Sequence, residues 1–336
     1  MNIFIGDSWL PKWICFKFHC CWLISVITKS VVSQKYKWLS TFLLTHFSFF
    51  TNSFVPTDDM RRYLPREFSD WVAFTFTTIM MHVIGFFELL VVLPYIDGKG
   101  SEAYWIHVAL GWILYVNSAA ALVMCITAET GSGSVVLPSI LKAGWRFCSS
   151  CEANAPPRSF HCWVCRKCVL SRDHHCVFTG NCIGHSNRRY FLLFLFYVWL
   201  AATYSTFLHF DYVIEMLHGF SWQALFTMLA PMISWMAGSS SAIHFPVAFL
   251  SSSTLIASLL VGGLLCWHLM NVTTGQTAHE RAKGCHDYDL GWRRNVEQVF
   301  GKNWTYAWIT PFIPSPLPTN GIEPPSKASG EIIKDM

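Results

Sequence analysis

The sequence predicts an all-α, multi-pass membrane protein whose four-helix transmembrane core carries a cytosolic, cysteine-rich double-zinc module between its second and third spans. Hydrophobic residues make up 53% of the 336 residues and charged residues only 13%, about half the charged fraction of an ordinary soluble domain. So much apolar surface requires a bilayer as its solvent. Seven of the 13 cysteines lie between Cys148 and Cys182, which favours metal binding or catalysis over disulfides. The net charge of +4 gives no indication of nucleic-acid binding.

The first 59 residues form a poorly defined apolar extension. Two apolar segments, 9–27 and 38–54, are interrupted by lysines, and neither has the compact core and cleavage site of a signal peptide. They are compatible with an added hairpin, an interfacial segment, or sequence upstream of the true start. Met60 directly precedes the basic flank of the first clear span, which favours the last of these interpretations.

Four apolar runs are long enough to cross a bilayer, which takes about 20 residues. Two lie in residues 60–128 and two in residues 190–270, namely 71–96, 104–127, 190–213 and 245–270. Another run near 222–237 is shorter and contains Pro231, so we predict that it is re-entrant or interfacial. Residues 271–336 form a C-terminal region that ends in a Pro-rich tail, which we expect to be extended or disordered.

The positive charges orient these spans. Basic residues precede the first span and follow the second, including Arg61, Arg62, Arg66, Lys142 and Arg146, whereas the loop between the two spans is nearly neutral. Because Lys and Arg accumulate on the cytoplasmic side, residues 129–189 are expected to face the cytosol. That compartment also keeps cysteine thiols reduced.

Polar residues inside the first two spans include His82 and Glu88 in the first and Asn117 in the second. Such residues are functional candidates, because burying them in a membrane is costly. An interhelical hydrogen bond or snorkelling at a helix end is nevertheless the favoured interpretation over catalysis.

The cysteine cluster contains ten candidate metal ligands. Its two C-x2-C pairs can each bring two thiolates to one ion from a tight turn, as in tetrahedral zinc sites. The candidates are Cys148, Cys151, His161, Cys162, Cys165, Cys168, His174, His175, Cys176 and Cys182. Two closed sites use eight ligands and leave two. If these two are one cysteine and one histidine, they are a candidate nucleophile and base, which the neighbouring Asp173 could orient.

The sequence from Asp173 to Cys176 reads Asp-His-His-Cys, and Asn181-Cys182-Ile183-Gly184 and Asn187 follow it. Inside this cysteine spacing, the pattern resembles the DHHC cysteine-rich domain of protein S-palmitoyltransferases over residues 148–191. Within that family, the segments 286–291 and 315–318 are most similar to the subgroup called palmitoyltransferase 24.

The resemblance implies two structural zinc ions. The first would be bound by Cys148, Cys151, His161 and Cys168, and the second by Cys162, Cys165, His175 and Cys182. Cys176 would then be the nucleophile, His174 the base and Asp173 its orienting partner. The implied reaction transfers a fatty acyl group from acyl-CoA, such as palmitoyl-CoA, through an acyl-enzyme to cysteine thiols of membrane-associated proteins. The implied location is an endomembrane, Golgi or endoplasmic reticulum, with the active site facing the cytosol.

The chain departs from the family pattern at three places. Val177-Phe178 replaces the Pro-Trp that commonly follows the catalytic cysteine. Ala278 replaces the second threonine of a Thr-Thr-x-Glu motif, so Asp173 needs another partner if that threonine normally hydrogen-bonds it. Residues 129–131 replace an Asp-Pro-Gly motif, whereas Asn295 resembles an asparagine of the family's C-terminal patch, where it implies a packing role.

Alternative functions remain open. A non-catalytic membrane scaffold could use the zinc module for protein interaction, although it would need no particular residue at Cys176. A transporter is suggested only by the number of spans. Four basic residues of the cysteine-rich region have two interpretations: they could attract the phosphates of CoA, or they could only set the membrane topology. They are Arg158, Arg166, Lys167 and Arg172.

The Thr277–Glu280 segment must share a side with Cys176 if it supports the orienting aspartate. An even number of crossings must then separate Arg189 from Asn271, which is why the short run near 222–237 is not expected to cross. The sequons at Asn271 and Asn303 would consequently be cytosolic and unmodified.

Overall fold

The computed structural model describes residues 63–241 and 243–327, so the N-terminal extension at 1–59 lies outside the described residues. Within the described part, four helices are long and apolar enough to cross a membrane: Phe68–Ile96, Glu102–Thr127, Arg188–Leu208 and His244–Thr273. The first consists of α3 (Phe68–Phe87), the π-helical turn η3 (Glu88–Val92) and α4 (Leu93–Ile96). The predicted four-helix core is therefore confirmed, with the cysteine-rich module between the second and third helices.

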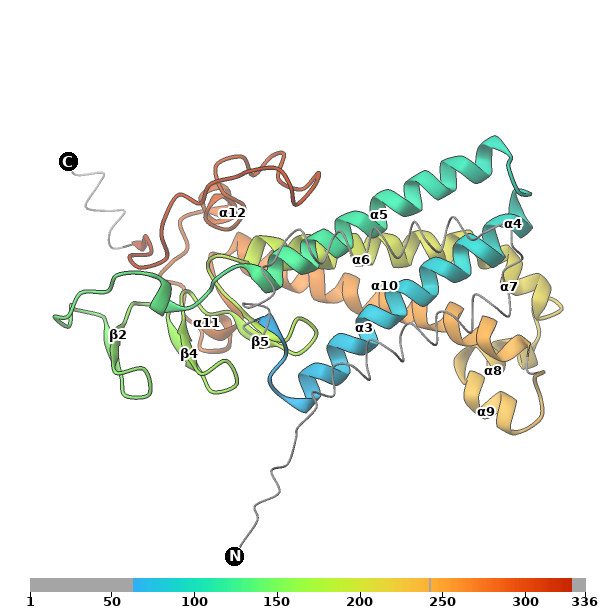
Figure 1. The fold of residues 1–336 in the computed structure, drawn as a ribbon, viewed down its shortest axis with the longest axis horizontal. Helices are drawn as coiled ribbons and strands as arrows, with labels where there is room; N and C mark the ends of the chain where they lie inside the picture. Colours follow the sequence, from blue (N-terminus) through green and yellow to red (C-terminus); the bar gives the residue numbers. More distant parts are fainter. Residues whose placement is uncertain (1–62, 242, 328–336) are drawn as a thin grey trace, which may run out of the picture. The chain divides into compact units, whose positions relative to one another are not determined.

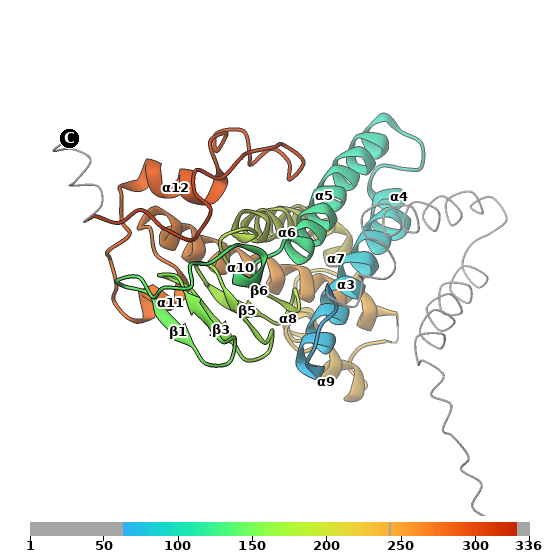
Figure 2. The ribbon, with the colours of Figure 1, turned by 60° about the vertical axis from the view of Figure 1, so that its left-hand side comes forward.

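Helix α6 (Arg188–Leu208) lies between α5 (Glu102–Thr127) and α10 (His244–Thr273) along much of its length (Figures 1 and 2). At the module end, buried Phe191, Leu192 and Leu265 form one apolar cluster with Cys176. The core of the helical bundle thus reaches directly to the cysteine-rich module.

Polar residues inside the spans connect neighbouring helices. The Tyr115 hydroxyl lies 2.8 Å from His82 Nε2, and Glu88 Oε1 lies 2.8 Å from His209 Nδ1. These contacts confirm the expected interhelical hydrogen bonds. Asn117 instead donates to the Ile113 carbonyl of its own helix at 2.8 Å.

The segment near 222–237 forms two short helices, α8 (Trp222–Leu229) and α9 (Pro231–Met236). At about 1.5 Å per residue, neither approaches the thickness of a bilayer. The helix breaks at Ala230 because Pro231, at the first turn of α9, has no N–H to continue the hydrogen-bond ladder. A re-entrant or interfacial position for this segment stays a prediction.

The third span is shorter than predicted, because α6 ends at Leu208 and the separate helix α7 (Phe210–Met216) follows. His209 lies at the break with backbone angles outside the helical region, and its ring faces Glu88.

The cysteine-rich module consists of three antiparallel hairpins in a row (Figure 2). They are β1–β2 (Arg146–Cys148 and Ala153–Ala155), β3–β4 (Phe160–Cys162 and Lys167–Val169) and β5–β6 (His174–Cys176 and Asn181–Ile183). Each begins 14 residues after the previous one. The turns share one left-handed residue at the same position, with φ of 50° at Glu152, 53° at Arg166 and 60° at Gly180. The module is therefore a threefold structural repeat.

The C-terminal region returns to the module end of the bundle. It contains α11 (Ala278–Ala282) and α12 (Trp292–Phe300), followed by an extended segment. Arg189 donates to the Ser315 carbonyl at 3.0 Å, and the Trp308 ring stacks on Phe300 with centroids 4.0 Å apart. The proline-rich segment is thus extended, as expected, but partly packed against α6 and α12.

Candidate active site and metal centres

Four predicted ligands converge across the first two hairpins. The ligand atoms of Cys148, Cys151, His161 and Cys168 all lie within 4.8 Å of one another. His161 Nδ1 is 3.7 Å from the Cys148 sulfur and 3.2 Å from the Cys151 sulfur. Ligand atoms around tetrahedral zinc lie about 3.5 Å apart, so this arrangement fits one zinc ion.

The other four ligands converge across the second and third hairpins. His175 Nδ1 lies 3.8 Å from the Cys162 sulfur, 3.4 Å from Cys165 and 3.8 Å from Cys182. This Cys₃His group also matches a closed, structural zinc site, with every ligand supplied by protein. The two sites would tie the three hairpins together, because each takes ligands from two neighbouring hairpins.

Asp70 is a partner of the second group that the sequence analysis missed. Its Oδ2 lies 3.1 Å from Nε2 of His175, and the residue is 1% exposed. A carboxylate on the far nitrogen of a metal-binding imidazole fixes the ring orientation and strengthens the ligand. Because Asp70 belongs to the first turn of α3, this contact also connects the first span to the cysteine-rich module.

The repeat explains why Cys176 is left over. Cys148 and Cys162 end the first strands of their hairpins, and Cys151 and Cys165 follow three residues later. In the third hairpin, Cys176 takes the first position but Thr179 takes the second. Cys176 therefore lies in a similar turn that lacks the second thiol, which in the other two turns belongs to a candidate metal site.

Asp173 and His174 lie beside this cysteine. Asp173 is 2% exposed, and its Oδ2 is 2.7 Å from His174 Nδ1. The aspartate is also held through its backbone, whose N–H donates to the Ile183 carbonyl at 2.8 Å. The same imidazole interacts with the Cys176 thiol. The three residues form a carboxylate–imidazole–thiol series.

The electrostatics of this series favour an imidazolium–thiolate pair. Burial alone would lower the pKa of His174, but hydrogen bonds and charge from Asp173 and Cys176 raise it to about 9. Burial alone would raise the pKa of Cys176, but His174 and Thr179 bring it below its ordinary value. Burial opposes ionisation of Asp173 too, yet the charge of Arg188 and the contact with His174 lower its pKa. A lowered cysteine pKa increases the fraction of thiolate, which is the nucleophilic form of the side chain.

Two further residues surround Asp173 that the sequence analysis did not single out. Arg188 Nη2 lies 3.3 Å from Asp173 Oδ1, and His268 Nδ1 lies 3.8 Å from Oδ2. The His268 ring packs 5.4 Å from that of His174 and 4.9 Å from Phe191. Both residues reach the site from transmembrane helices: Arg188 is the first residue of α6, just before the apolar run 190–213, and His268 lies inside the run 245–270. The local signals were therefore a charged residue beside one apolar run and a polar residue within another.

The Thr277–Glu280 segment contacts the same aspartate. The Ala278 N–H donates to Asp173 Oδ1 at 3.0 Å. A backbone group at position 278 is thus the partner that Asp173 needs in the absence of a threonine hydroxyl. Thr277 and Glu280 form a reciprocal capping box that orients this backbone. The expectation that this segment lies beside the Asp-His-His-Cys sequence agrees with the structure.

Several basic residues considered for CoA phosphates have internal partners. Arg158 makes two 2.6 Å hydrogen bonds to the Glu280 carboxylate and stacks 4.2 Å from the Tyr288 ring. Lys167 pairs with Glu129 at 2.9 Å. Arg172 is half-buried beside the thiols of Cys162 and Cys182, whereas Arg166 is exposed.

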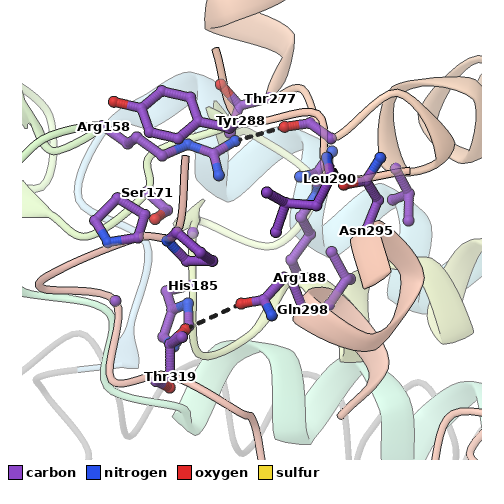
Figure 3. A pocket seen from close by; sticks show the side chains of 17 residues that line it. Arg158, Ser171, His185, Arg188, Thr277, Tyr288, Leu290, Asn295, Gln298 and Thr319 are labelled. Carbon is purple, nitrogen blue, oxygen red and sulfur yellow. Dashed lines mark hydrogen bonds between the residues drawn. The ribbon is translucent and has the colours of Figure 1, made fainter. Parts of the chain in front are cut away.

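Arg158 and Arg188 also line a small cavity between the module, the ends of α6 and α10, and the C-terminal region. In Figure 3, Arg158 lies beside Tyr288, and His185 points toward Thr319, whose carbonyl accepts its Nε2–H at 2.9 Å. The cavity therefore marks the place where the C-terminal region closes over the module.

Comparisons with known proteins show which family the chain resembles. The DHHC palmitoyltransferase family model matches residues 142–284. The chain is 34% identical over 227 residues to a mouse protein named probable palmitoyltransferase ZDHHC24, covering 66% of this chain and 79% of that protein. The rat protein of the same name is 37% identical over 185 residues, and the match spans 64% of its length and 54% of this chain. An Arabidopsis thaliana protein named probable protein S-acyltransferase 15 is 28% identical over 258 residues, covering 68% of this chain and 93% of that protein.

Proposed function

Because the chain belongs to the DHHC palmitoyltransferase family, we propose that it is a membrane-bound protein S-acyltransferase that forms an acyl-enzyme on Cys176. The observation that carries the proposal is the series Asp173–His174–Cys176, in which the one cysteine of the three hairpins that belongs to neither candidate metal site lies next to a histidine oriented by a buried carboxylate. Nucleophilic thiols in proteins are activated by this kind of partner.

In the first half-reaction, His174 accepts the Cys176 proton and the thiolate attacks the carbonyl carbon of a fatty acyl-CoA. The thioester bond to CoA breaks, the CoA thiolate takes up the proton from His174, and the acyl group remains on Cys176. Asp173 keeps Nδ1 of His174 protonated and stabilises the imidazolium. In the second half-reaction, a substrate thiol gives its proton to His174, attacks the acyl-enzyme and releases Cys176, which regains the proton.

The surroundings of Cys176 suit a lipid chain. Cys176 is 7% exposed and belongs to the apolar cluster that contains Phe191, Leu192 and Leu265 on the spanning helices. The acyl chain of a donor such as palmitoyl-CoA would lie against these side chains, while its polar head stays in water. The acceptors would be cysteines of proteins at the same membrane.

The two groups of four ligands would hold two structural zinc ions, which supply rigidity to the hairpins rather than chemistry. This assignment follows from the closed ligand sets, which leave no position for a reacting group. The cytosolic orientation inferred from the charges, and an endomembrane location in the Golgi or endoplasmic reticulum, complete the proposal.

The test is labelling of the purified protein with a clickable palmitoyl-CoA analogue. Wild-type protein should acquire a hydroxylamine-sensitive label, and Cys176→Ser should lose it while retaining two zinc ions. Cys285→Ser, which removes a thiol outside the candidate sites, is the matched control and should label normally. Undiminished labelling of Cys176→Ser would refute the nucleophile, and a wild-type protein that binds zinc but never labels would favour the scaffold alternative.

A further inference from the structure

Asp173 poses an electrostatic problem that the proposed mechanism does not solve by itself. Its carboxylate is almost fully buried, and a buried charge is tolerated only when charged or hydrogen-bonding partners surround it. Oδ2 is used by His174. Oδ1 receives the Ala278 N–H, but the side chain at position 278 offers no hydroxyl.

Arg188 occupies an unfavourable place unless it serves this carboxylate. It is the first residue of α6, where the partial positive charge of the helix N-terminus disfavours a cation. It is also 7% exposed, so its guanidinium has lost most of its water. Among the described residues, the carboxylate with which Arg188 forms an ion pair is that of Asp173, at 3.3 Å.

The guanidinium is held from a second direction. Arg188 Nη2 donates to the Gln276 carbonyl at 2.7 Å, and Gln276 lies two residues before Ala278. The arginine therefore joins the start of α6, the segment after α10 and the Asp173 carboxylate. Its position is determined by backbone as well as by charge.

We propose that Arg188 is a positioning residue for acyl transfer: with the Ala278 N–H, it holds Asp173 Oδ1 so that Oδ2 stays directed at His174, and it substitutes for a hydroxyl at position 278. The inference rests on the proposed function and adds to it a residue that touches neither the thiol nor the acyl donor. Arg188 acts through Asp173 and then through the orientation of the His174 ring.

His268 contributes to the same enclosure. Its ring packs against His174 and Phe191, with Nδ1 3.8 Å from Asp173 Oδ2. That nitrogen is buried and has no hydrogen-bond partner within the described part of the chain. His268 thus limits the movement of His174 by packing, but it does not provide the short polar contact that Arg188 and Ala278 make with Asp173.

The neighbouring Arg189 is the matched control. It is equally buried, at 8% exposed, and belongs to the same turn of α6, but its guanidinium donates to the Ser315 carbonyl and the Tyr190 hydroxyl. Replacing Arg189 removes a buried guanidinium and its hydrogen bond to the C-terminal region, which should lower stability. The replacement should not disturb Asp173.

The experiment compares Arg188→Met, Arg188→Lys, Arg189→Met, Ala278→Thr and the double variant Arg188→Met/Ala278→Thr. Acylation of Cys176 is followed in single-turnover reactions at saturating acyl-CoA, alongside the zinc content and the melting temperature of each protein. Position 278 is partly exposed, so a threonine side chain can be accommodated there. Its hydroxyl would lie close to Asp173, because the backbone N–H of residue 278 already contacts that carboxylate.

Arg188→Met should slow the acylation rate on the order of 10- to 100-fold, the range typical for partners that orient a functional imidazole. The KM for acyl-CoA and the two zinc ions should be unchanged, Arg188→Lys should be intermediate, and Ala278→Thr should restore part of the rate in the double variant. Arg189→Met should lower the melting temperature without slowing acylation at saturation. The rescue distinguishes positioning from a general packing defect.

The inference is overturned if Arg188→Met is acylated at the wild-type rate. It is also overturned if Arg188→Met and Arg189→Met lose the same fraction of the acylation rate and Ala278→Thr does not restore the rate of Arg188→Met. In both cases wild-type labelling would still support the S-acyltransferase proposal. If the wild-type protein itself forms no acyl-enzyme, the proposed function fails instead.

Discussion

At the level of single residues, thiols in equivalent positions of the cysteine-rich module have different partners. Cys162 and Cys176 occupy equivalent positions in neighbouring hairpins, yet Cys162 lies among three other candidate metal ligands and Cys176 lies beside His174. What differs is the residue three positions later, Cys165 in one hairpin and Thr179 in the other. The chemistry of each thiol is therefore set by its partners rather than by its backbone.

His174→Ala should reduce acylation of Cys176 strongly, on the order of 100-fold or more, because proton transfer by a positioned base contributes about that much. The imidazole is absent from both groups of four metal ligands, so the zinc content should stay at two ions per chain. Single-turnover labelling and metal analysis of the same preparation check this. A simultaneous loss of zinc would show that His174 is a ligand.

At the level of the hairpin, the threefold repeat predicts the effect of adding a second thiol to the third turn. Thr179→Cys gives the third turn the same pair of thiols as the first two, at a spacing that allows a metal or disulfide partner for Cys176. Because the thiol of Cys176 would then be occupied, acylation should fall and become dependent on reductant or chelator.

Thr179→Ser is the control for this variant, since it keeps the buried hydroxyl that hydrogen-bonds Cys176 and carries no thiol. It should retain acylation that is insensitive to reductant. Equal, reductant-independent labelling of the Cys and Ser variants would mean that the third hairpin does not share the ligand geometry of the others.

At the level of the helix, Asp70 connects α3 to the second candidate zinc site. Asp70→Asn should weaken zinc at that site about 10- to 100-fold, as observed for other outer partners of metal-binding histidines. Competition with a chromogenic chelator measures this affinity. Asp97→Asn, which alters the other end of the same span near His107, should leave it unchanged; an equal effect of both substitutions would contradict a specific role for Asp70.

At the scale of the whole molecule, the sequence was most informative where function depends on short spacings. The cysteine spacing and the Asp-His-His-Cys run carried the family resemblance, which implied the two ligand groups that the structure brings together, and apolar runs predicted the four long helices. Asp70, Arg188 and His268 could not be assigned, because each reaches the site from a spanning helix whose position in space no local pattern records. The end of the third helix at Leu208 could not be assigned either, and the next residue, His209, contacts Glu88 on a distant segment.

The contact between Ala278 and Asp173 has a consequence for topology. It requires Cys176 and the Thr277–Glu280 segment to share one side of the membrane, so α8 and α9 should not cross it. In sealed microsomes the C-terminal region should therefore be digested by added protease, and Asn303 should carry no glycan. Protection of that region, or glycosylation at Asn303, would contradict this topology.

The most direct measurement is mass spectrometry of the purified protein after brief incubation with palmitoyl-CoA. A single hydroxylamine-labile palmitoyl thioester should appear on the peptide that contains Cys176, in protein that retains two zinc ions. It should disappear when a protein bearing an acceptor cysteine is added. A palmitoyl group found only on other cysteines, or none at all on zinc-replete protein, would contradict the assignment of Cys176 as the acyl-carrying nucleophile.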